Sequence, residues 1–262
     1  MQKELPEFLY HYTTIESLAL ILKNRTIRFN NLSDVDDLEE GVTNDLGRIG
    51  KSVFVSCWTD SDKENIPLWY MYSRSMSGVR IKLPIHQFGD KPDIFFGNTK
   101  DDDHESKGIF KSRISCDFED PLMWSPWVRY TNNEKKLKPK LIKSVNVDGH
   151  MEKRIYAAGY VKRKCWEFQS ECRYIIRYLP YPKGREKNDK EKELITKAYK
   201  NINQVPSPDL YLRIIDNCFN QMEVMIGPGA NQGQRTIVHN LIEKYNPIAK
   251  ISESQLTGKI RF

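Results

Sequence analysis

The chain has 262 residues, of which 39% are hydrophobic and 29% are charged. These proportions are typical of a globular protein with its own core and exclude a disordered chain. The 41 lysines and arginines exceed the 35 aspartates and glutamates, for a formal net charge of +6. That excess allows a polyanionic partner such as nucleic acid but does not require one.

The sequence shows no sign of membrane insertion, export or structural metal. No apolar run approaches the ~18 residues of a membrane-spanning helix, and the opening MQKELPEFLYHYTT lacks the apolar segment of a signal peptide. The five cysteines are an odd number without a C-x-x-C pair, which argues against disulfides or structural zinc. We expect a cytoplasmic protein with reduced thiols, no metal and no membrane contact.

The first predicted elements are a strand over 8–12, a helix over 14–24 and a strand over 26–29. The apolar residues of this helix recur at i, i+3, i+4 and i+7: Ile15, Leu18, Ala19 and Leu22. Thr13 and Glu16 have the S/T-x-x-E spacing of a capping box, which predicts Thr13 as the cap.

Eight later runs are short and rich in β-branched and aromatic residues, as strands are: 53–58, 78–83, 93–96, 113–118, 155–161, 173–178, 210–215 and 223–226. Helices are predicted over 65–74, 188–201 and 233–245. Since strands and helices do not alternate regularly, a doubly wound parallel sheet fits poorly. We expect an α+β fold with split, mostly antiparallel β-sheets and flanking helices.

Two polar stretches interrupt this pattern, at 131–150 and 182–200. Charge runs of this kind are usually solvated loops or helix faces, although a basic arm for an acidic partner is the alternative. Neither stretch separates two cores, so we expect a single domain over 1–262 with these as insertions. The glycine-rich run 226–233 favours a strand–turn–helix connection over a phosphate-binding loop.

Common enzyme motifs are absent: there is no G-x-S-x-G, H-E-x-x-H or G-x-x-x-x-G-K-[ST]. The acidic run 34–40 has the start of a calcium-loop pattern, but Leu38 occupies the third ligand position and the glycine is missing. The sequence therefore gives no metal site.

Two segments suggest chemistry. Tyr10-His11-Tyr12-Thr13 ends a strand directly before a capped helix. Gln169 and Glu171, in the run 166–173, are two residues apart, so in an extended strand they point to one face. A glutamate with an amide beside it can orient a sugar hydroxyl and stabilise a cationic sugar. The alternative is an ordinary exposed polar face, with His11 and Thr13 in structural roles.

The run at 10–13, followed by Leu18 and Ile21-Leu22, resembles the first nucleotide-binding element of ADP-ribosyltransferase-like domains. It is distantly similar to the H-x-T-x-x-x-x-L-x-x-I-L opening of DarT-type DNA ADP-ribosyltransferases. The Gln169-x-Glu171 pair resembles the [QE]-x-E element that carries the catalytic glutamate of many such enzymes.

Over about residues 9–262 the chain also resembles a bacterial domain-of-unknown-function family with a Y-H-Y-T motif. The landmarks follow in order: Y-H-Y-T at 10–13, Asp37-x-Glu39, Phe54-Val55-Ser56, Leu68-Trp69-x-x-Tyr72, Gly78-Val79, Trp166-x-x-x-x-Glu171-x-Arg173 and Ile226-Gly227-Pro228.

The resemblance implies NAD as substrate and no metal, with one group of catalytic residues and another of NAD-binding residues. Glu171 would bind the ribose 2′-hydroxyl and Gln169 would position the acceptor. The implied NAD contacts are His11 at a ribose, the Tyr12 and Thr13 backbone along the nicotinamide amide, Ser56 on the supporting strand, and Trp69 or Tyr72 stacked near the nicotinamide. The arginine for the NAD phosphates is not identified; Arg28, Arg74 and Arg80 are the candidates.

The implied activity is a glycosyltransferase reaction that cleaves the nicotinamide–ribose bond and transfers ADP-ribose to a macromolecular acceptor, nucleic acid or protein. Domains of this kind are often toxins or antiviral defence effectors with an inhibitor or antitoxin partner. Two alternatives stay open: an NAD glycohydrolase on the same fold, and a non-catalytic nucleic-acid-binding module that uses the lysine clusters with Trp124 and Trp127. Acceptor, oligomeric state and regulation are not encoded in any motif.

Overall fold

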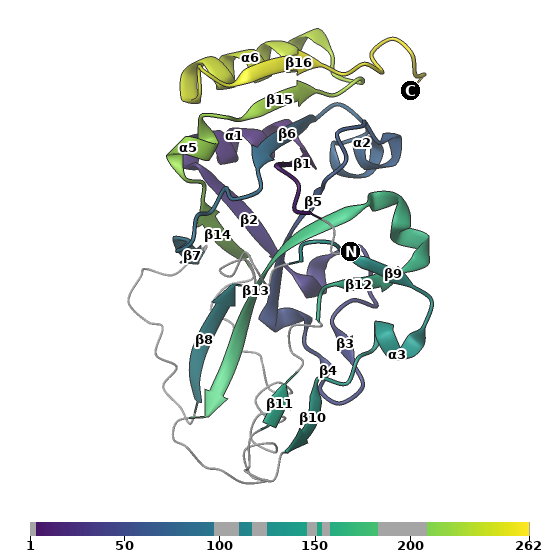
Figure 1. Cartoon of the computed structure of the whole chain (residues 1–262). Helices are drawn as coiled ribbons and strands as arrows, with labels where there is room; N and C mark the ends of the chain where they lie inside the picture. The colour runs from purple at the N-terminus through teal and green to yellow at the C-terminus, as the bar shows by residue number, and fades with distance from the viewer. Residues whose placement is uncertain are drawn as a thin grey trace.

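The structure, a computed structural model, describes residues 4–96, 110–116, 125–145, 151–153, 158–182 and 209–261 (Figure 1). Its centre is a ten-stranded sheet, accompanied by three two-stranded sheets and by short helices. Over these residues no helix has the length and apolarity needed to cross a bilayer.

The ten-stranded sheet is antiparallel except where β15 and β16 pair. Its strands are β1 (Phe8–Thr13), β2 (Thr26–Asn31), β5 (Val53–Thr59), β6 (Val79–Pro84), β7 (Ile94–Phe96), β8 (Phe110–Cys116), β13 (Glu171–Pro182), β14 (Asp209–Arg213), β15 (Glu223–Ile226) and β16 (Lys250–Glu253). The main order is β16-β15-β6-β1-β5-β2-β14-β7, with β13 joining β5 and β8 joining β13. The α+β class with a mostly antiparallel sheet is therefore confirmed.

The sheet forks at β5. Along one edge β5 pairs with β13 from Thr59 to Val53. The other edge is shared, because β1 pairs with it at Thr59 while β2 pairs with it at Phe54 and Val55. The strands β1 and β2 consequently diverge from β5 in two directions and leave an opening between them.

The strand β5 is buried on both faces. Phe54 and Trp58 belong to the main hydrophobic core, which also receives α1 (Ile15–Asn24) and α6 (Gln232–Tyr245). Val53 and Val55 belong to a second core on the other face, together with residues from 158–160 and from β13. Burial on both faces favours a mostly apolar strand over an alternating one, and the VFVSCWT sequence of β5 is apolar except at Ser56 and Thr59.

The remaining elements are small. They are η1 (Leu32–Asp34), β3 (Val42–Thr43), β4 (Gly47–Arg48), η2 (Gly50–Ser52), α2 (Ile66–Tyr72), β9 (Arg129–Thr131), α3 (Glu134–Leu137), β10 (Ile142–Val145), β11 (Met151–Lys153), β12 (Val161–Arg163), η5 (Lys164–Gln169) and α5 (Asp216–Phe219). The pairs β3–β4, β9–β12 and β10–β11 form the two-stranded sheets.

The predicted cap of the first helix is wrong by one residue. The side chain of Thr14, not Thr13, accepts the hydrogen bond from the backbone N–H of Ser17, at 3.1 Å. Thr13 is instead the last residue of β1 and pairs with Val79 of β6. Threonine is a preferred N-cap residue at either position, and the extent of the β1–β6 ladder decides between the two.

The predicted strand over 155–161 is not seen where the structure describes it. Residues 158–160 form a turn and β12 starts at Val161. Gly159 has a φ of +88°, and a Cβ there would lie 2.8 Å from the Ile175 side chain, so the chain turns rather than continuing extended. The predicted helix over 188–201 lies outside the described residues.

The glycine-rich turn after β15 is hydrogen-bonded to the segment before β6 rather than forming an open loop. Residues 74–76 all have left-handed backbone, with φ of 52°, 52° and 71°. The turn holds them in place, because the Gly227 N–H donates to Gly78 O at 2.8 Å and the Gly229 N–H donates to Met76 O at 3.0 Å. With its amides used this way, the turn leads into α6, as the strand–turn–helix interpretation predicts.

Gly227→Ala should therefore destabilise the fold. The added Cβ would lie 2.3 Å from Met76 O, a backbone contact that only a shift of β6 or β15 can relieve. Overpacking of this kind typically costs about 1–3 kcal/mol. Gly233→Ala, inside α6 and 3.4 Å from the nearest atom, is the control and should gain about 0.5–1 kcal/mol. Urea unfolding of both variants checks the prediction, and equal midpoints would contradict it.

Candidate functional site

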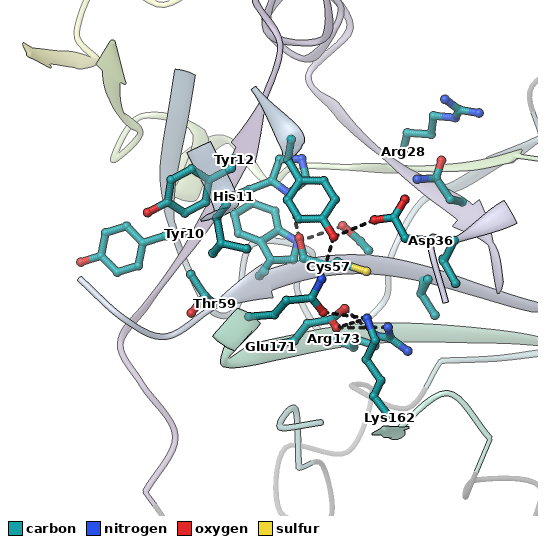
Figure 2. A pocket seen from close by; sticks show the side chains of 18 of the residues that line it. Tyr10, His11, Tyr12, Arg28, Asp36, Cys57, Thr59, Lys162, Glu171 and Arg173 are labelled. Carbon is teal, nitrogen blue, oxygen red and sulfur yellow. Dashed lines mark hydrogen bonds and ion pairs between the residues drawn. The ribbon is translucent and has the colours of Figure 1, made fainter. Parts of the chain in front are cut away.

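A pocket of about 280 Å³ lies at the fork of the sheet (Figure 2). Its walls come from β1, β2, β5, α2, η5, β12, β13 and the segment after η1. The lining residues are Tyr10, His11, Tyr12, Arg28, Asn30, Asp34, Val35, Asp36, Val55, Ser56, Cys57, Trp58, Thr59, Leu68, Tyr72, Lys162, Gln169, Glu171 and Arg173.

Six of the eight predicted site residues line this pocket: His11, Tyr12, Ser56, Tyr72, Gln169 and Glu171. Thr13 and Trp69 do not. Trp69 is fully buried, donates its indole N–H to Glu64 at 2.9 Å and meets the Tyr12 ring edge-on at 4.8 Å between centroids. It therefore supports Tyr12 from behind and is not available to stack on a ligand.

Gln169 and Glu171 reach the pocket, but not by strand alternation as predicted. Gln169 ends the 3-10 helix η5, Ser170 has left-handed backbone with φ of 43°, and Glu171 is the first residue of β13. The run 166–173 does open a strand, since β13 begins at Glu171, but the predicted extended backbone from Gln169 to Glu171 is wrong. The turn at Ser170, rather than the pleat, brings the two side chains together.

Glu171 belongs to a buried ion cluster with Glu40, Lys162 and Arg173. Its Oε1 accepts from Arg173 Nε at 2.6 Å, and its Oε2 accepts from Lys162 Nζ at 3.1 Å. Glu40 faces the same two cations, with Arg173 Nη2 donating at 2.9 Å and Lys162 Nζ at 3.3 Å. Two carboxylates and two cations give zero net charge, which is how buried charges are tolerated.

The cluster keeps Glu171 ionised. Burial by itself would raise the pKa of Glu171, but the charges of Arg173 and Lys162 outweigh burial and lower that pKa to about 2. At any physiological pH the side chain is an anion. It can accept hydrogen bonds and stabilise positive charge, but it cannot serve as a general acid.

A hydrogen-bonded chain extends from this cluster across the pocket. Lys162 Nζ donates to Gln169 Oε1, Gln169 Nε2 donates to the Tyr72 hydroxyl, and this hydroxyl donates to Asp36 Oδ2, each at 2.7 Å. Burial, reinforced by the bond to Asp36, raises the pKa of Tyr72 well above its ordinary value. Tyr72 is therefore a neutral phenol whose proton is directed at Asp36.

His11 is held as a neutral ring. Its Nδ1 lies 2.8 Å from the carbonyl oxygen of Cys57, which can only accept, so Nδ1 carries the proton. Burial lowers the pKa of His11, and its ring packs against Trp58 at 4.9 Å. The remaining nitrogen, Nε2, is then a hydrogen-bond acceptor.

Cys57 is not a candidate nucleophile. Burial, followed by the neighbouring Glu171 carboxylate, raises the pKa of its thiol far above the ordinary value. The thiol is protonated at physiological pH, whereas the nucleophilic form is the thiolate.

Of the three arginines considered for phosphate binding, only Arg28 lines the pocket. Its side chain is 56% exposed and pairs with Asp209 at 2.7 Å, and Figure 2 shows it well apart from Glu171. Arg74 pairs with Glu16 at the surface. Arg80 is buried with its guanidinium 4.7 Å above the Tyr10 ring.

The carboxylates of the acidic run 34–40 point to different partners. Asp36 accepts from Tyr72, Glu39 forms a two-pronged pair with Arg163 at 2.5 and 2.8 Å, and Glu40 pairs with Arg173. In the part of the chain that the structure describes, no group of three potential metal ligands occurs. The run therefore contributes hydrogen-bond and ion-pair partners to the pocket.

The features proposed for nucleic-acid binding are only partly visible. Trp124 and residues 183–200 lie outside the described residues. Trp127 is engaged, with its indole N–H donating to Asp60 at 2.7 Å. The described part of the stretch 131–150 carries the end of β9, α3 and β10, and so is not one uninterrupted arm.

The sequence did not point to Lys162, Asp36 or Cys57 as lining residues, nor to Glu40, which contacts the same two cations as Glu171. Lys162 and Glu40 stand in no motif. The acidic run 34–40 contains the Asp37-x-Glu39 landmark and an incomplete calcium-loop pattern, and neither predicts an ion pair at Glu40.

Comparisons with protein families, curated proteins and solved structures find no match for this chain.

The low pKa of Glu171 predicts a pH dependence of stability. A carboxyl with a pKa of about 2 when folded and ~4.3 when unfolded stabilises the fold above pH ~4.3, and that contribution is lost as pH falls towards 2. Urea unfolding between pH 6 and pH 2 should show stability rising with pH across this window. Glu171→Gln should be less stable at pH 6 and should depend less on pH in the window. An unchanged slope in the variant would contradict the assignment.

Proposed function

We propose that this pocket binds NAD and breaks the bond between nicotinamide and ribose, with Glu171 as the catalytic carboxylate and a protein or nucleic acid as acceptor of ADP-ribose. The observation that supports this is the convergence of separate motifs. His11, Ser56 and Glu171 come from distant parts of the sequence and lie on the adjacent strands β1, β5 and β13 around one pocket.

The state of Glu171 suits this reaction. Loss of nicotinamide leaves a ribose with oxocarbenium character, as in glycoside hydrolysis. A fixed anion in a buried pocket stabilises such a charge without reorganising during the reaction. Because its pKa is about 2, Glu171 is a weak base. Its role is therefore electrostatic, with acceptance of a ribose hydroxyl, rather than removal of a proton from the acceptor.

Other lining residues fit the remaining parts of NAD. The acceptor nitrogen Nε2 of His11 suits a ribose hydroxyl. Arg28, on β2, is the pocket arginine suited to a phosphate, and its partner Asp209 would then share it. Gln169 presents its amide beside Glu171, where the acceptor would approach.

The wider biological statements rest on the motif resemblance alone. They are the ADP-ribosyltransferase-like identity of the forked sheet, a cytoplasmic location, action as a toxin or antiviral defence effector, and control by an inhibitor or antitoxin. The geometry of the pocket supports the proposed reaction but says nothing about these wider statements.

Glu171→Gln should abolish most NAD turnover. Removing one preorganised charge-stabilising group typically lowers kcat about 100-fold or more. Since the variant also unbalances a buried ion cluster, at a cost of ~3–5 kcal/mol, it needs a control with the same structural damage. Glu40→Gln is that control, because Glu40 contacts the same two cations but does not line the pocket.

Both variants should lose comparable stability, while Glu40→Gln keeps kcat within about tenfold of the parent, ~1.4 kcal/mol in the barrier. Nicotinamide release and urea unfolding are the two measurements, made where both variants are folded. Equal losses of kcat in the two would mean that Glu171 acts only as an ion-pair partner.

Transfer and hydrolysis share the first step, because Glu171 stabilises the same cation whichever nucleophile attacks. Incubation with NAD labelled in the adenylate part and a cell lysate separates them. We expect label on a macromolecule, and nuclease and protease treatment then tells nucleic acid from protein. Label only in free ADP-ribose would establish the glycohydrolase instead.

NAD binding itself is tested by thermal unfolding, since a ligand of the native state raises the melting temperature by mass action. No shift at millimolar NAD, together with salt-sensitive binding to nucleic acid, would favour the binding-module alternative.

A further inference from the structure

Lys162 is a pocket residue whose role the proposed reaction does not yet explain. It is the central residue of β12, is only 4% exposed and lines the pocket. Its ammonium lies 2.7 Å from Gln169 Oε1, 3.1 Å from Glu171 Oε2 and 3.3 Å from Glu40 Oε1. One buried cation therefore contacts both candidate catalytic side chains and the carboxylate behind them.

The contact with Gln169 determines which way its amide faces. An ammonium has donors only, so the amide must turn its oxygen towards Lys162. Its nitrogen then faces the Tyr72 hydroxyl, whose own proton is directed at Asp36. Without Lys162 only the Tyr72 end would hold the amide, and its oxygen would lose the donor that fixes it on the cluster side.

We propose that Lys162 is a positioning residue that sets the orientation of the Gln169 amide, so that Gln169 presents an N–H donor rather than its oxygen to whatever binds beside Glu171. Lys162 acts through Gln169 and not on the substrate. The kinetic consequence rests on the proposed function, whereas the orientation of the amide does not.

The competing explanation is that Lys162 only neutralises Glu40. The net charge of the cluster in different variants distinguishes the two explanations. Replacing Lys162 alone leaves the cluster with net negative charge. Replacing Lys162 and Glu40 together restores neutrality and keeps the Glu171–Arg173 pair, whose Oε1–Nε distance is 2.6 Å. A double variant therefore removes the contacts of Lys162 with Gln169 and Glu171 without leaving an unpaired buried charge.

The experiment compares Lys162→Met, Glu40→Gln and the double variant by urea unfolding and nicotinamide release from NAD. Lys162→Met should lose stability, and the double variant should recover most of the lost urea midpoint. Its kcat should nevertheless stay at least about tenfold below that of Glu40→Gln, with a smaller change in KM, because coupled neighbours are not additive. A double variant with the kcat of Glu40→Gln would overturn the positioning role.

A second measurement needs no NAD. In the ¹⁵N-labelled unliganded protein, the side-chain amide of Gln169, assigned with Gln169→Leu, should show slow exchange with water. In the double variant its resonances should shift and exchange faster. Unchanged resonances would overturn the proposal even if wild-type protein turns over NAD. If the wild type does not turn over NAD, the proposed function fails, and the amide resonances still decide the role of Lys162.

Discussion

The architecture of the pocket depends on one interaction, the buried cluster of Glu40, Lys162, Glu171 and Arg173. It ties the segment after η1, the short strand β12 and the start of β13 together through charge-assisted bonds. Each group is buried and would be costly alone, so the four are stable only as a neutral set. The walls of the pocket are consequently coupled, and losing one charge disturbs three segments.

The position of the pocket follows from the fork of the sheet. β5 is held by packing on both faces and by pairing with β13 on one edge. On its other edge β1 and β2 separate. The stretch of β5 between their pairing points pairs with neither strand on that edge and borders the pocket. Trp69 packs against Tyr12 of β1 and so supports the wall of the opening that β1 forms. The site is thus shaped by main-chain topology before side chains define its chemistry.

The neutrality of the cluster also sets the condition under which the proposed reaction would run. Under that proposal, Glu171 would act on a cationic ribose while it stays paired with two cations, which Glu40 shares. The same cations hold its pKa at about 2, so the carboxylate is available as an anion but not as a proton carrier. Under the proposed function, any base that the acceptor requires would have to be another group.

Local pattern in the sequence determined most strands, the helices at 15–24, 66–72 and 232–245, and two motifs that meet in the pocket, Tyr10–Thr13 and Gln169–Glu171. Hydrophobic period and residue preference act over a few residues, so one sequence suffices to read them. The tertiary structure alone decided that Thr14 caps α1, that Ser170 turns the chain, and that Lys162 and Glu40 belong beside Glu171. Arg173 and Glu40 are 133 residues apart. Packing that pairs such distant charges produces no recognisable pattern in the sequence around either residue.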